Sequence, residues 1–401
     1  MAKRNVEHPR IALQIEKNRA HGRALLEGIA DYALQKTDWR LELVDPESLQ
    51  DVASVRAFDG LIVRVMDDEM EAVLRKSRRP VVDTYGRVDD NPLPSIRLDD
   101  AAISAMAFHC LVERHYQAFA YCGFPGVRFS DARGQAFESL VRQNGATISL
   151  YDGKGPVTDT FFRDEKTDVP DAPALAAWLT TLPKPVALFC CNDLRAVQAM
   201  KICADLGLDV PRDIAILGVD NDVLLCTFTN PSLSSVQTEP AALGWQAAKM
   251  LDDQMHVRET AARSASVRGG APCLWAPKKV VERMSTDSYP FKTPWLADAV
   301  RFIRRNVENG VSATDVISHV GYSHPKVNKA FNAELGHPIK KEIQLQRSRL
   351  ACSLLQETNL PIGEISVRCG YQRAAYFVSS FSEEFGLTPE AWRKRRVFQE
   401  V

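Results

Sequence analysis

The sequence predicts a two-lobed α/β domain with parallel, doubly wound sheets, followed by an all-α domain that contains the same helical unit twice. Short apolar strands alternate with amphipathic helices from about residue 10 to residue 280, a pattern typical of parallel sheets covered by helices on both faces. Two such series of strands within this length predict two lobes. In the C-terminal part a Gly-aromatic pair recurs about 50 residues apart, at Gly321 and Gly370.

The first lobe is predicted from four apolar segments and an amphipathic helix. Leu25, Leu26, Ile29 and Leu34 recur at helical spacing, so 21–35 is expected to form a helix. Strands are expected at 10–15, 41–44, 61–65 and 81–85. The second lobe is predicted from helices 101–114, 133–144 and 194–206 and from strands 118–123, 147–151, 186–191 and 214–220. Because doubly wound sheets bind ligands beyond the carboxyl ends of their strands, we expect a site in the cleft between the lobes.

Each C-terminal repeat is predicted to form two helices joined by a sharp turn. In the first repeat, Ser312 and Asp315 have the spacing of a capping box at the start of a helix. Gly321 permits the left-handed backbone that ends this helix and turns the chain. Ser323 is then expected to cap the next helix, with Pro325 in its first turn, where a missing N–H costs little.

The second helix of each repeat is predicted to have a buried face and an outward face. Val327 and Phe331 in the first repeat, like Phe377 and Phe381 in the second, are four residues apart and are expected to face the core. In the short helix before the second turn, we expect an apolar face of Ile362, Ile365 and Val367. The outward face of the first repeat carries Pro325, Lys326, Asn328 and Lys329, and that of the second carries Arg373, Ala374, Ala375, Val378 and Ser379. A single glycine-centred pair of helices would also fit an ordinary helical corner, but two copies predict tandem helix-turn-helix units that contact neighbouring major-groove segments.

The C-terminal part resembles the AraC-type DNA-binding domain over roughly residues 296–396. The resemblance rests on both repeats, on the helix of about 339–358 between them, and above all on LLQETNLPIGEISVRCGYQRAAYFVSSFSEEFGLTPEAWRKRR, which begins at Leu354. It implies that the second helix of each repeat enters the major groove of double-stranded DNA. The residues expected to contact DNA bases are then Pro325, Asn328 and Lys329 in the first repeat and Ala374, Ala375, Val378 and Ser379 in the second. Pro361 stands where that family has a small polar cap, and the second repeat offers few hydrogen-bonding side chains, so we expect it to read thymine methyls and DNA shape.

Charge separates the two parts of the chain. Residues 291–401 hold 16 Lys and Arg against 11 Asp and Glu, a net charge of +5, whereas the other 290 residues carry −6 and the whole chain −1. A basic end on an acidic body is expected when only one part meets phosphate. The run 393–396, RKRR, fits either a phosphate contact or a solvated helix end. We expect an effector domain at 1–284, a proline-stiffened linker at 285–295 and a DNA-binding domain at 296–401.

The N-terminal part resembles the sugar-binding core of LacI-type repressors, which is itself similar to periplasmic sugar-binding proteins. The stretches that carry this resemblance are VALFCCNDLRAVQAMKICADLGLDVPRDIAILGVDND, from Val186, and PSLSSVQTEPAALGWQAAKMLDD, from Pro231. With the AraC-type end, the whole chain resembles xylose-operon regulators of the XylR type. The resemblance implies D-xylose or a similar monosaccharide as effector, control of transcription through RNA polymerase if the protein is an activator, and a homodimer.

The same resemblance implies ligand-binding roles for Asp220 at the end of a strand, for Arg133 and for Asn192. Carboxylate, guanidinium and amide groups supply the charge-assisted hydrogen bonds that sugar hydroxyls need. The first lobe adds candidates that follow its expected strands: Gln14, Glu16 and Asp83. Asp220 and Asp83 could instead cap a turn, and Arg133 could form a surface ion pair.

Several other classes of protein are disfavoured. There is no Gly-x-Gly-x-x-Gly after the first strand, no phosphate-binding loop and no metal-ligand spacing among the eight histidines, so neither an enzyme nor a cofactor is expected. No apolar run of 18 residues indicates a membrane span. The start MAKRNVEHPR lacks the apolar core of a signal peptide, and the nine cysteines are expected to be reduced, which favours the cytoplasm over a secreted sugar-binding protein.

Overall fold

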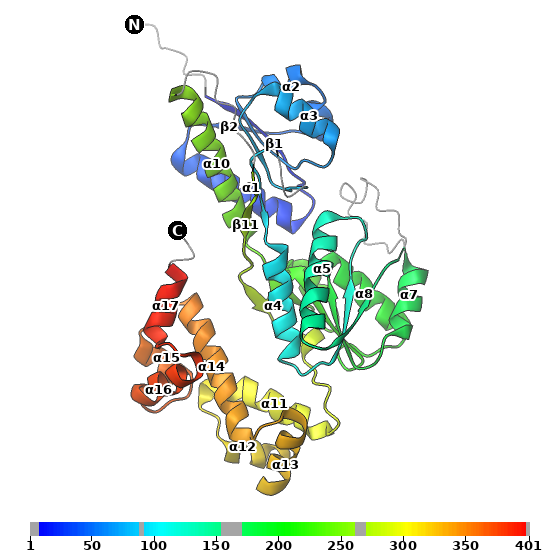
Figure 1. The fold of residues 1–401 in the computed structure, drawn as a ribbon, viewed down its shortest axis with the longest axis vertical. Coiled ribbons are helices and arrows are strands. Elements are labelled where there is room, and N and C mark those ends of the chain that lie inside the picture. The colour runs from blue at the N-terminus through cyan, green and yellow to red at the C-terminus, as the bar shows by residue number, and fades with distance from the viewer. Residues whose placement is uncertain (1–7, 88–91, 154–170, 261–269, 398–401) are drawn as a thin grey trace. The chain divides into compact units, whose positions relative to one another are not determined.

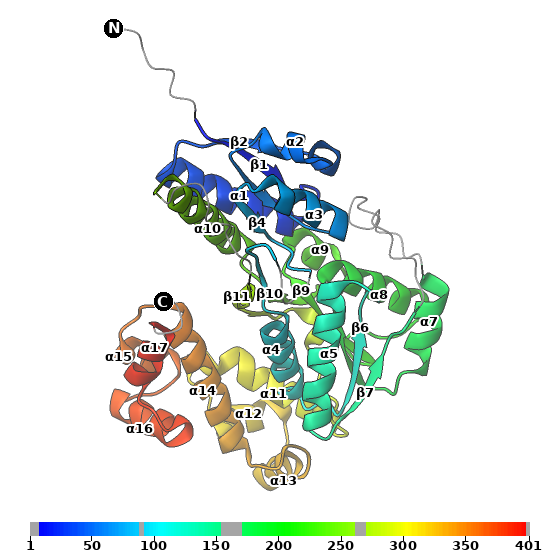
Figure 2. The ribbon, with the colours of Figure 1, turned by 45° about the horizontal axis from the view of Figure 1, so that its top comes forward.

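The computed structural model describes residues 8–87, 92–153, 171–260 and 270–397, and the chain forms two compact units. Unit 1 is Met1–Asp287 and unit 2 is Ser288–Val401. Figures 1 and 2 show the sheets in unit 1 and the helices of unit 2. The predicted fold class is confirmed: an α/β part with parallel sheets precedes an all-α part.

The first lobe of unit 1 is a four-stranded parallel sheet of order β2-β1-β3-β4. Its strands are β1 (Arg10–Gln14), β2 (Arg40–Leu43), β3 (Gly60–Val63) and β4 (Val81–Asp83). Its helical segments are α1 (Ala20–Lys36), η1 (Pro46–Leu49), α2 (Val52–Arg56), α3 (Asp68–Ser77) and α10 (Pro240–Thr260). Helices α1 and α10 lie side by side (Figures 1 and 2), and a Cβ on Gly28 would overlap the carbonyl oxygen of Ala241. This close approach joins the start of the chain to a helix more than 200 residues later.

The second lobe is a six-stranded sheet of order β12-β10-β9-β8-β6-β7, in which only the β10–β12 pair is antiparallel. Its strands are β6 (Ala118–Cys122), β7 (Thr147–Leu150), β8 (Val186–Cys190), β9 (Ile214–Asp220), β10 (Ser234–Gln237) and β12 (Lys279–Val281). Helices α4 (Asp100–Val112) and α5 (Arg128–Gln143) cover one face. Helices α7 (Ala172–Thr181) and α8 (Asp193–Asp205) cover the other, and α9 (Val223–Phe228) and η2 (Met284–Thr286) complete the lobe.

The chain passes between the lobes at β5 (Ile96–Leu98), between β10 and α10, and between β11 (Cys273–Trp275) and β12. Strands β5 and β11 pair in parallel and form a small sheet of their own. Because the lobes are joined by these segments, each lobe contains parts of the chain that are distant in sequence. The last residues of unit 1 are packed into the domain. Ser285 and Thr286, which we expected in the linker from the sequence, are fully buried.

Most predicted boundaries lie within one or two residues of the observed ones, and two of the differences have a structural consequence. Strand β4 ends at Asp83 instead of residue 85, because the Asp83 carboxylate accepts hydrogen bonds from the backbone N–H groups of Tyr85 (2.9 Å) and Gly86 (3.0 Å) and so bends the chain. Helix α5 begins at Arg128, five residues earlier than predicted. Arg128 and Arg133 therefore share one helix, separated by little more than one turn.

Unit 2 consists of helices that pack around two separate cores. Its helical segments are α11 (Pro294–Asn306), η3 (Val307–Asn309), α12 (Ala313–Val320), α13 (His324–Leu335), α14 (Ile339–Glu357), α15 (Ile362–Arg368), α16 (Ala374–Phe385) and α17 (Pro389–Val397). One core joins α11–α13 to the start of α14, and the other joins α15–α17 to its end. Helix α14 runs between the two helix pairs in both views (Figures 1 and 2).

The local signals at the turns are largely confirmed. Ser312 and Asp315 form a reciprocal capping box, and Gly321 and Gly370 adopt left-handed φ values of 71° and 75°. Ser323 occupies the N-cap position of α13, but its side chain makes no capping hydrogen bond. The predicted inward position of Val367 is wrong: its side chain is 67% exposed, and the buried positions of α15 are Ile365 and Ser366.

The two helix-turn-helix repeats also contact each other outside α14. A Cβ on Gly370 would lie 2.7 Å from the Cα of Gly310, which shows that the turn of the second repeat packs on the backbone just before the first. Arg347 on α14 donates to the carbonyl oxygen of Val311 (3.1 Å), and its guanidinium carbon lies 5.3 Å from the ring centre of Tyr371. These contacts hold the two repeats at a defined spacing.

Candidate ligand pocket and nucleic-acid interface

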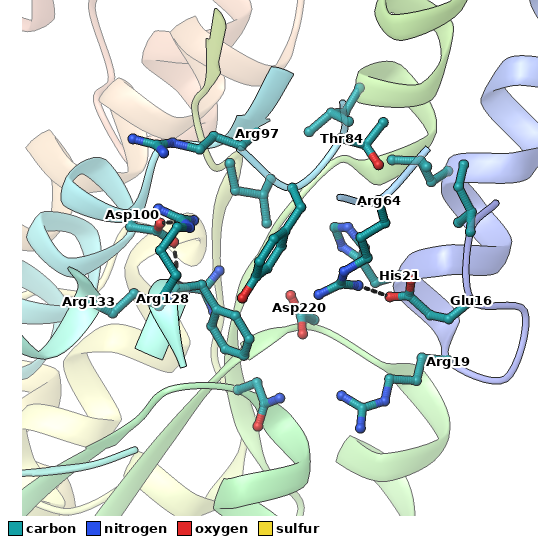
Figure 3. A pocket seen from close by; sticks show the side chains of 17 residues that line it. Glu16, Arg19, His21, Arg64, Thr84, Arg97, Asp100, Arg128, Arg133 and Asp220 are labelled. Carbon is teal, nitrogen blue, oxygen red and sulfur yellow. Dashed lines mark hydrogen bonds and ion pairs between the residues drawn. The ribbon is translucent and has the colours of Figure 1, made fainter. Parts of the chain in front are cut away.

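A pocket of about 90 Å³ lies in unit 1 at the carboxyl ends of β1, β3, β8 and β9 and at the start of α5. Side chains from both lobes line it (Figure 3). Its ionisable lining residues, Tyr85 aside, are Glu16, Arg19, His21, Arg64, Arg97, Asp100, Arg128, Arg133 and Asp220. The location agrees with the rule that doubly wound sheets bind ligands beyond the carboxyl ends of their strands.

Asp220 is held in the pocket by the turn that follows β9. The residue has a φ of 106° and the next one, Asn221, a φ of 54°, so the chain leaves the strand abruptly. Arg283 donates to the Asn221 side-chain oxygen (2.7 Å), and Ser235 accepts from the Asn221 backbone N–H (2.9 Å), which secures the turn. Among the described residues none donates a hydrogen bond to the Asp220 carboxylate, and burial raises the pKa of this carboxyl. A carboxylate in this position is available to a ligand.

Arg133 is held by Asp100 and by the backbone. Its Nε donates to Asp100 Oδ1 (2.9 Å) and its Nη1 to the carbonyl oxygen of Cys191 (2.5 Å), while its guanidinium carbon lies 5.0 Å from the ring centre of Phe129. Arg128 donates to the other oxygen of the same carboxylate, Asp100 Oδ2, at 2.7 Å. Two guanidinium groups of one helix therefore share a single carboxylate. Arg133 is buried, so the alternative of a surface ion pair is wrong.

The oxygen of the Asn192 side chain has a structural role, whereas its amide nitrogen is available to the pocket. Its side-chain oxygen accepts from the backbone N–H of Arg195 (2.9 Å) and caps α8. Within the described part of the chain its amide nitrogen has no acceptor, and the residue lines the pocket. The side-chain oxygen also accepts from the Cys191 thiol (3.8 Å), so we expect Asn192 to contact a ligand mainly as a donor.

The first lobe contributes an ion pair between Arg64 and Glu16. Burial opposes the charge of Glu16, but Arg64 and His21 hold the pKa of Glu16 below its ordinary value. Burial lowers the pKa of His21, although Asp220 and Glu16 act against this shift. At neutral pH this side of the pocket thus carries the Arg64–Glu16 ion pair, a neutral imidazole and the guanidinium of Arg19.

Two predicted ligand residues lie elsewhere. The Asp83 carboxylate is fully buried and accepts from the backbone N–H groups of Val65, Tyr85 and Gly86, at 3.1, 2.9 and 3.0 Å. It does not line the pocket, so its predicted ligand role is wrong and its turn-capping alternative is correct. Gln14 lines a neighbouring cavity and its side-chain oxygen accepts from the Arg64 backbone N–H (3.0 Å). Glu16 lines both cavities.

Sequence reasoning missed several charged and aromatic lining residues: Arg19, His21, Arg64, Tyr85, Arg97, Asp100, Arg128 and Phe129. Arg64 and Tyr85 stood at the carboxyl ends of predicted strands, which was a usable signal. Arg97 lies in β5 and Asp100 closely follows it, but this short strand was not predicted, and the remaining residues follow no predicted strand directly. Among the described residues there is no cluster of His, Cys, Asp and Glu with the arrangement of a metal site. Nor do the described segments include a helix that could span a bilayer.

In the first repeat the predicted DNA-contacting residues of α13 are mostly exposed. Pro325, Lys326 and Lys329 are open to solvent, and the Lys326 ammonium lies 3.7 Å from the ring centre of Tyr322. Asn328 is half-buried, and its side-chain oxygen accepts from the backbone N–H of Ile339 (3.3 Å). Asn328 therefore stabilises the start of α14, which leaves fewer of its groups for base reading.

In the second repeat the exposed positions of α16 are mainly small. Of the predicted residues, Arg373, Ala374, Ala375 and Ser379 are exposed, whereas Val378 is half-buried and packs on the core of α15–α17. Tyr376, which sequence reasoning missed, is 67% exposed. Tyr376 directly precedes the buried Phe377, so it lies about 100° around the helix from the residue that faces the core. The helical period therefore allowed its exposure to be predicted.

The comparisons with known proteins cover both units. Residues 108–286 match a periplasmic binding protein-like domain, and residues 308–395 match a helix-turn-helix domain. The xylose operon regulatory protein of Escherichia coli (strain K12) is 28% identical over 394 residues, covering 96% of each chain, and that of Haemophilus influenzae is 27% identical over 397 residues, covering 96% of this chain and 98% of its own. A solved structure of the xylose-binding transcription activator xylR covers 97% of this chain and 98% of its own, with a TM-score of 0.59 and 28% identity. The chain is therefore a transcription regulator in which a periplasmic binding protein-like domain precedes a helix-turn-helix domain.

Proposed function

We propose that this regulator binds a monosaccharide in the pocket of unit 1, xylose or a sugar of similar size, and that the sugar controls how unit 2 binds DNA. The observation that carries this proposal is the convergence of Asp220, Arg133 and Asn192 in one pocket. The three side chains offer an acceptor, a charged donor and a neutral donor to adjacent hydroxyl groups, and Phe129 offers an apolar surface. The curated relatives carry xylose in their names.

The connection from the sugar to the end of unit 1 follows β9. Asp220 ends this strand in the pocket, and the Ser285 hydroxyl donates to the carbonyl oxygen of Ile216 in the same strand (2.6 Å). Thr286 is held as well, since Arg114 donates to its carbonyl oxygen (2.9 Å). A ligand that pulls on the Asp220 turn therefore acts on the strand to which the last residues of unit 1 are bonded. The coupling free energy cannot exceed the difference in sugar affinity between the two states, typically about 1–3 kcal/mol.

The proposal extends to the setting in which the protein works. It acts in the cytoplasm as a homodimer, contacts RNA polymerase as an activator, and turns over no substrate. The relative whose structure is solved is described as a transcription activator. Dimerisation would place two unit 2 domains on one operator and so multiply the number of contacted groove segments.

Thermal unfolding of the full chain with free monosaccharides tests the proposal directly. A sugar that binds only the folded state adds stability, about 2.7 kcal/mol at 100 times its Kd, and raises the unfolding temperature. The same sugar should change the affinity for operator DNA or the length of the protected footprint. If a stabilising sugar leaves both DNA affinity and footprint identical, the proposed coupling is wrong.

Substitution of Lys329 separates base reading from phosphate contact. Lys329→Ala should weaken operator binding by about 1–3 kcal/mol if the ammonium reads a base, and should lower the salt dependence by about one unit of slope if it meets a phosphate. Fluorescence anisotropy at several salt concentrations measures both quantities. Lys201→Ala, an exposed lysine of α8 in unit 1, is the matched control. If the two variants bind the operator with equal affinity, the proposed contact between α13 and DNA is wrong.

A further inference from the structure

We infer that Asp193 is a positioning residue of the ligand pocket: it fixes Asp220 relative to Asn192 and so selects among sugars that differ in the direction of one hydroxyl group. The inference rests on the proposed function and names a residue that determines its specificity. Asp193 is buried, with 1% of its surface exposed, and it is not among the pocket-lining residues of the described chain. Its effect on a ligand must therefore act through the residues that it contacts.

The Asp193 carboxylate holds the turn after β9 at two points. Its Oδ2 accepts from the backbone N–H of Asp222 (2.8 Å), and its Oδ1 accepts from the hydroxyl of Ser235 (2.6 Å). The Ser235 hydroxyl oxygen accepts in turn from the backbone N–H of Asn221 (2.9 Å). Both amides that follow Asp220 are thus held by Asp193, one directly and one through Ser235.

The turn needs this support because its backbone conformation is unfavourable. Asp220 and Asn221 have φ values of 106° and 54°, in the left-handed region that residues other than glycine rarely adopt. Such conformations persist only where the surrounding structure fixes them. Without the contacts from Asp193 we expect the turn to relax and the Asp220 carboxylate to leave its place in the pocket.

A glycine in β9 lets the carboxylate of Asp193 approach this strand. A Cβ on Gly218 would lie 2.2 Å from Asp193 Oδ1 and 3.2 Å from the Asp193 Cα. A larger residue at this position would therefore push the carboxylate away from β9. As a result, the first turn of α8 packs directly on the strand that ends in Asp220.

The residue before Asp193 is the ligand donor of the same lobe. Asn192 caps α8 through its side-chain oxygen, which accepts from the backbone N–H of Arg195 (2.9 Å), and it lines the pocket. Two adjacent residues thus place the donor of Asn192 and hold the acceptor of Asp220. A fixed spacing between donor and acceptor favours one arrangement of neighbouring hydroxyl groups, because an epimer leaves a buried polar group unpaired.

Asp193→Asn is the conservative variant and should retain most of the sugar affinity. Burial raises the pKa of Asp193, and the nearby carboxylate of Asp220 adds to this shift, so a neutral side chain is tolerated in this place. The amide oxygen can accept from the Asp222 N–H, and the amide nitrogen can donate to the hydroxyl oxygen of Ser235. Asp193→Ala loses both contacts.

Isothermal titration of the full chain with sets of epimers tests the inference. D-xylose is compared with D-lyxose, D-ribose and L-arabinose, and D-glucose with D-galactose. Asp193→Ala should weaken binding of the tightest sugar at least about tenfold and reduce its preference over the epimers at least about threefold. Asp205→Ala, at an exposed position near the end of α8, is the matched control and should change neither quantity. If none of these sugars binds the unchanged protein, the proposed function is wrong and the inference falls with it.

Amide hydrogen exchange of the unliganded full chain separates positioning from a general structural role. In Asp193→Ala, exchange should accelerate in residues 219–223, which contain the two bound amides, while β6 and β8 keep their protection. Faster exchange throughout the second lobe would show that Asp193 stabilises the lobe as a whole and would overturn the inference. An unchanged sugar affinity and epimer preference would overturn it too, and would leave the proposed function intact.

Ser235→Ala covers the case in which Asp193→Ala does not fold. It removes only the hydroxyl that links Asp193 to Asn221, and it should also accelerate exchange in residues 219–223 and weaken sugar binding. Ser77→Ala is the matched control, because Ser77 is a buried serine of α3 whose hydroxyl donates to a backbone carbonyl oxygen (2.6 Å). If both serine variants bind the sugar as tightly as the unchanged protein, Asp193 does not act through this turn and the inference is wrong.

Discussion

Asp220→Asn is expected to lower the affinity for the sugar effector at least about 100-fold. The carboxylate would accept two charge-assisted hydrogen bonds from sugar hydroxyls, each contributing about 1.5–3 kcal/mol, and an amide offers only one weaker acceptor in the same place. Isothermal titration measures the loss directly. The response of operator binding to the sugar should disappear with it.

The stability of the unliganded Asp220 variant distinguishes the ligand role from a capping role. Burial raises the pKa of Asp220, which means that its ionised form opposes folding and that its contribution to stability grows as the pH falls through this raised pKa. Removal of the charge should therefore leave the unfolding temperature at neutral pH unchanged or higher. Asp205→Asn, at an exposed position near the end of α8, is the control. A clearly lower unfolding temperature for Asp220→Asn alone would show that the carboxylate holds the turn and not the ligand.

The second large effect is expected at Gly370. Alanine there must adopt a φ of 75°, which costs about 1–2 kcal/mol, and its Cβ would also meet the Cα of Gly310 at 2.7 Å and the carbonyl oxygen of Val307 at 3.1 Å. Both neighbours are backbone atoms, so they can yield only if the two repeats move apart. Gly370→Ala should lower the free energy of unfolding of unit 2 by about 2–5 kcal/mol.

Gly321→Ala is the matched control, because it measures the cost of the left-handed backbone conformation alone. Gly321 has nearly the same φ, 71°, at the equivalent turn of the first repeat, but no atom of the described structure lies within 4 Å of a Cβ built there. Its substitution should cost only about 1–2 kcal/mol. Amide hydrogen exchange of residues 288–401 within the full chain compares the two variants, and operator binding should fall far more for Gly370→Ala. Equal effects would mean that the contact between the repeats contributes nothing.

Local patterns in the sequence predicted most of the secondary structure. The capping box of Ser312 and Asp315 and the left-handed turns at Gly321 and Gly370 depend on neighbours within a few residues, so they could be predicted from the sequence. Failures arose where packing overrode a pattern. Val367 is apolar but exposed, because the core of α15–α17 is already filled by Ile365, Phe377 and other side chains.

The candidate pocket was predictable only in part, as the two strand-terminal aspartates show. Asp83 and Asp220 both end a strand of a parallel sheet, and nothing in their local sequence separates their roles. Three N–H groups of the loops around Asp83 satisfy its carboxylate, whereas the turn after Asp220 leaves that carboxylate facing the pocket. The path of the backbone beyond each strand makes the difference.

By itself, the amino-acid sequence determined that the chain carries a parallel α/β part and two helix-turn-helix repeats, since periodicity, capping and turn glycines act over short distances. The tertiary structure alone decided which charges share the pocket. Arg64, Asp100 and Arg128 lie on segments separated by up to 64 residues, and their balance depends on the contact between two lobes. Electrostatic interactions depend on distance in space and on burial, and neither quantity is a property of the local sequence.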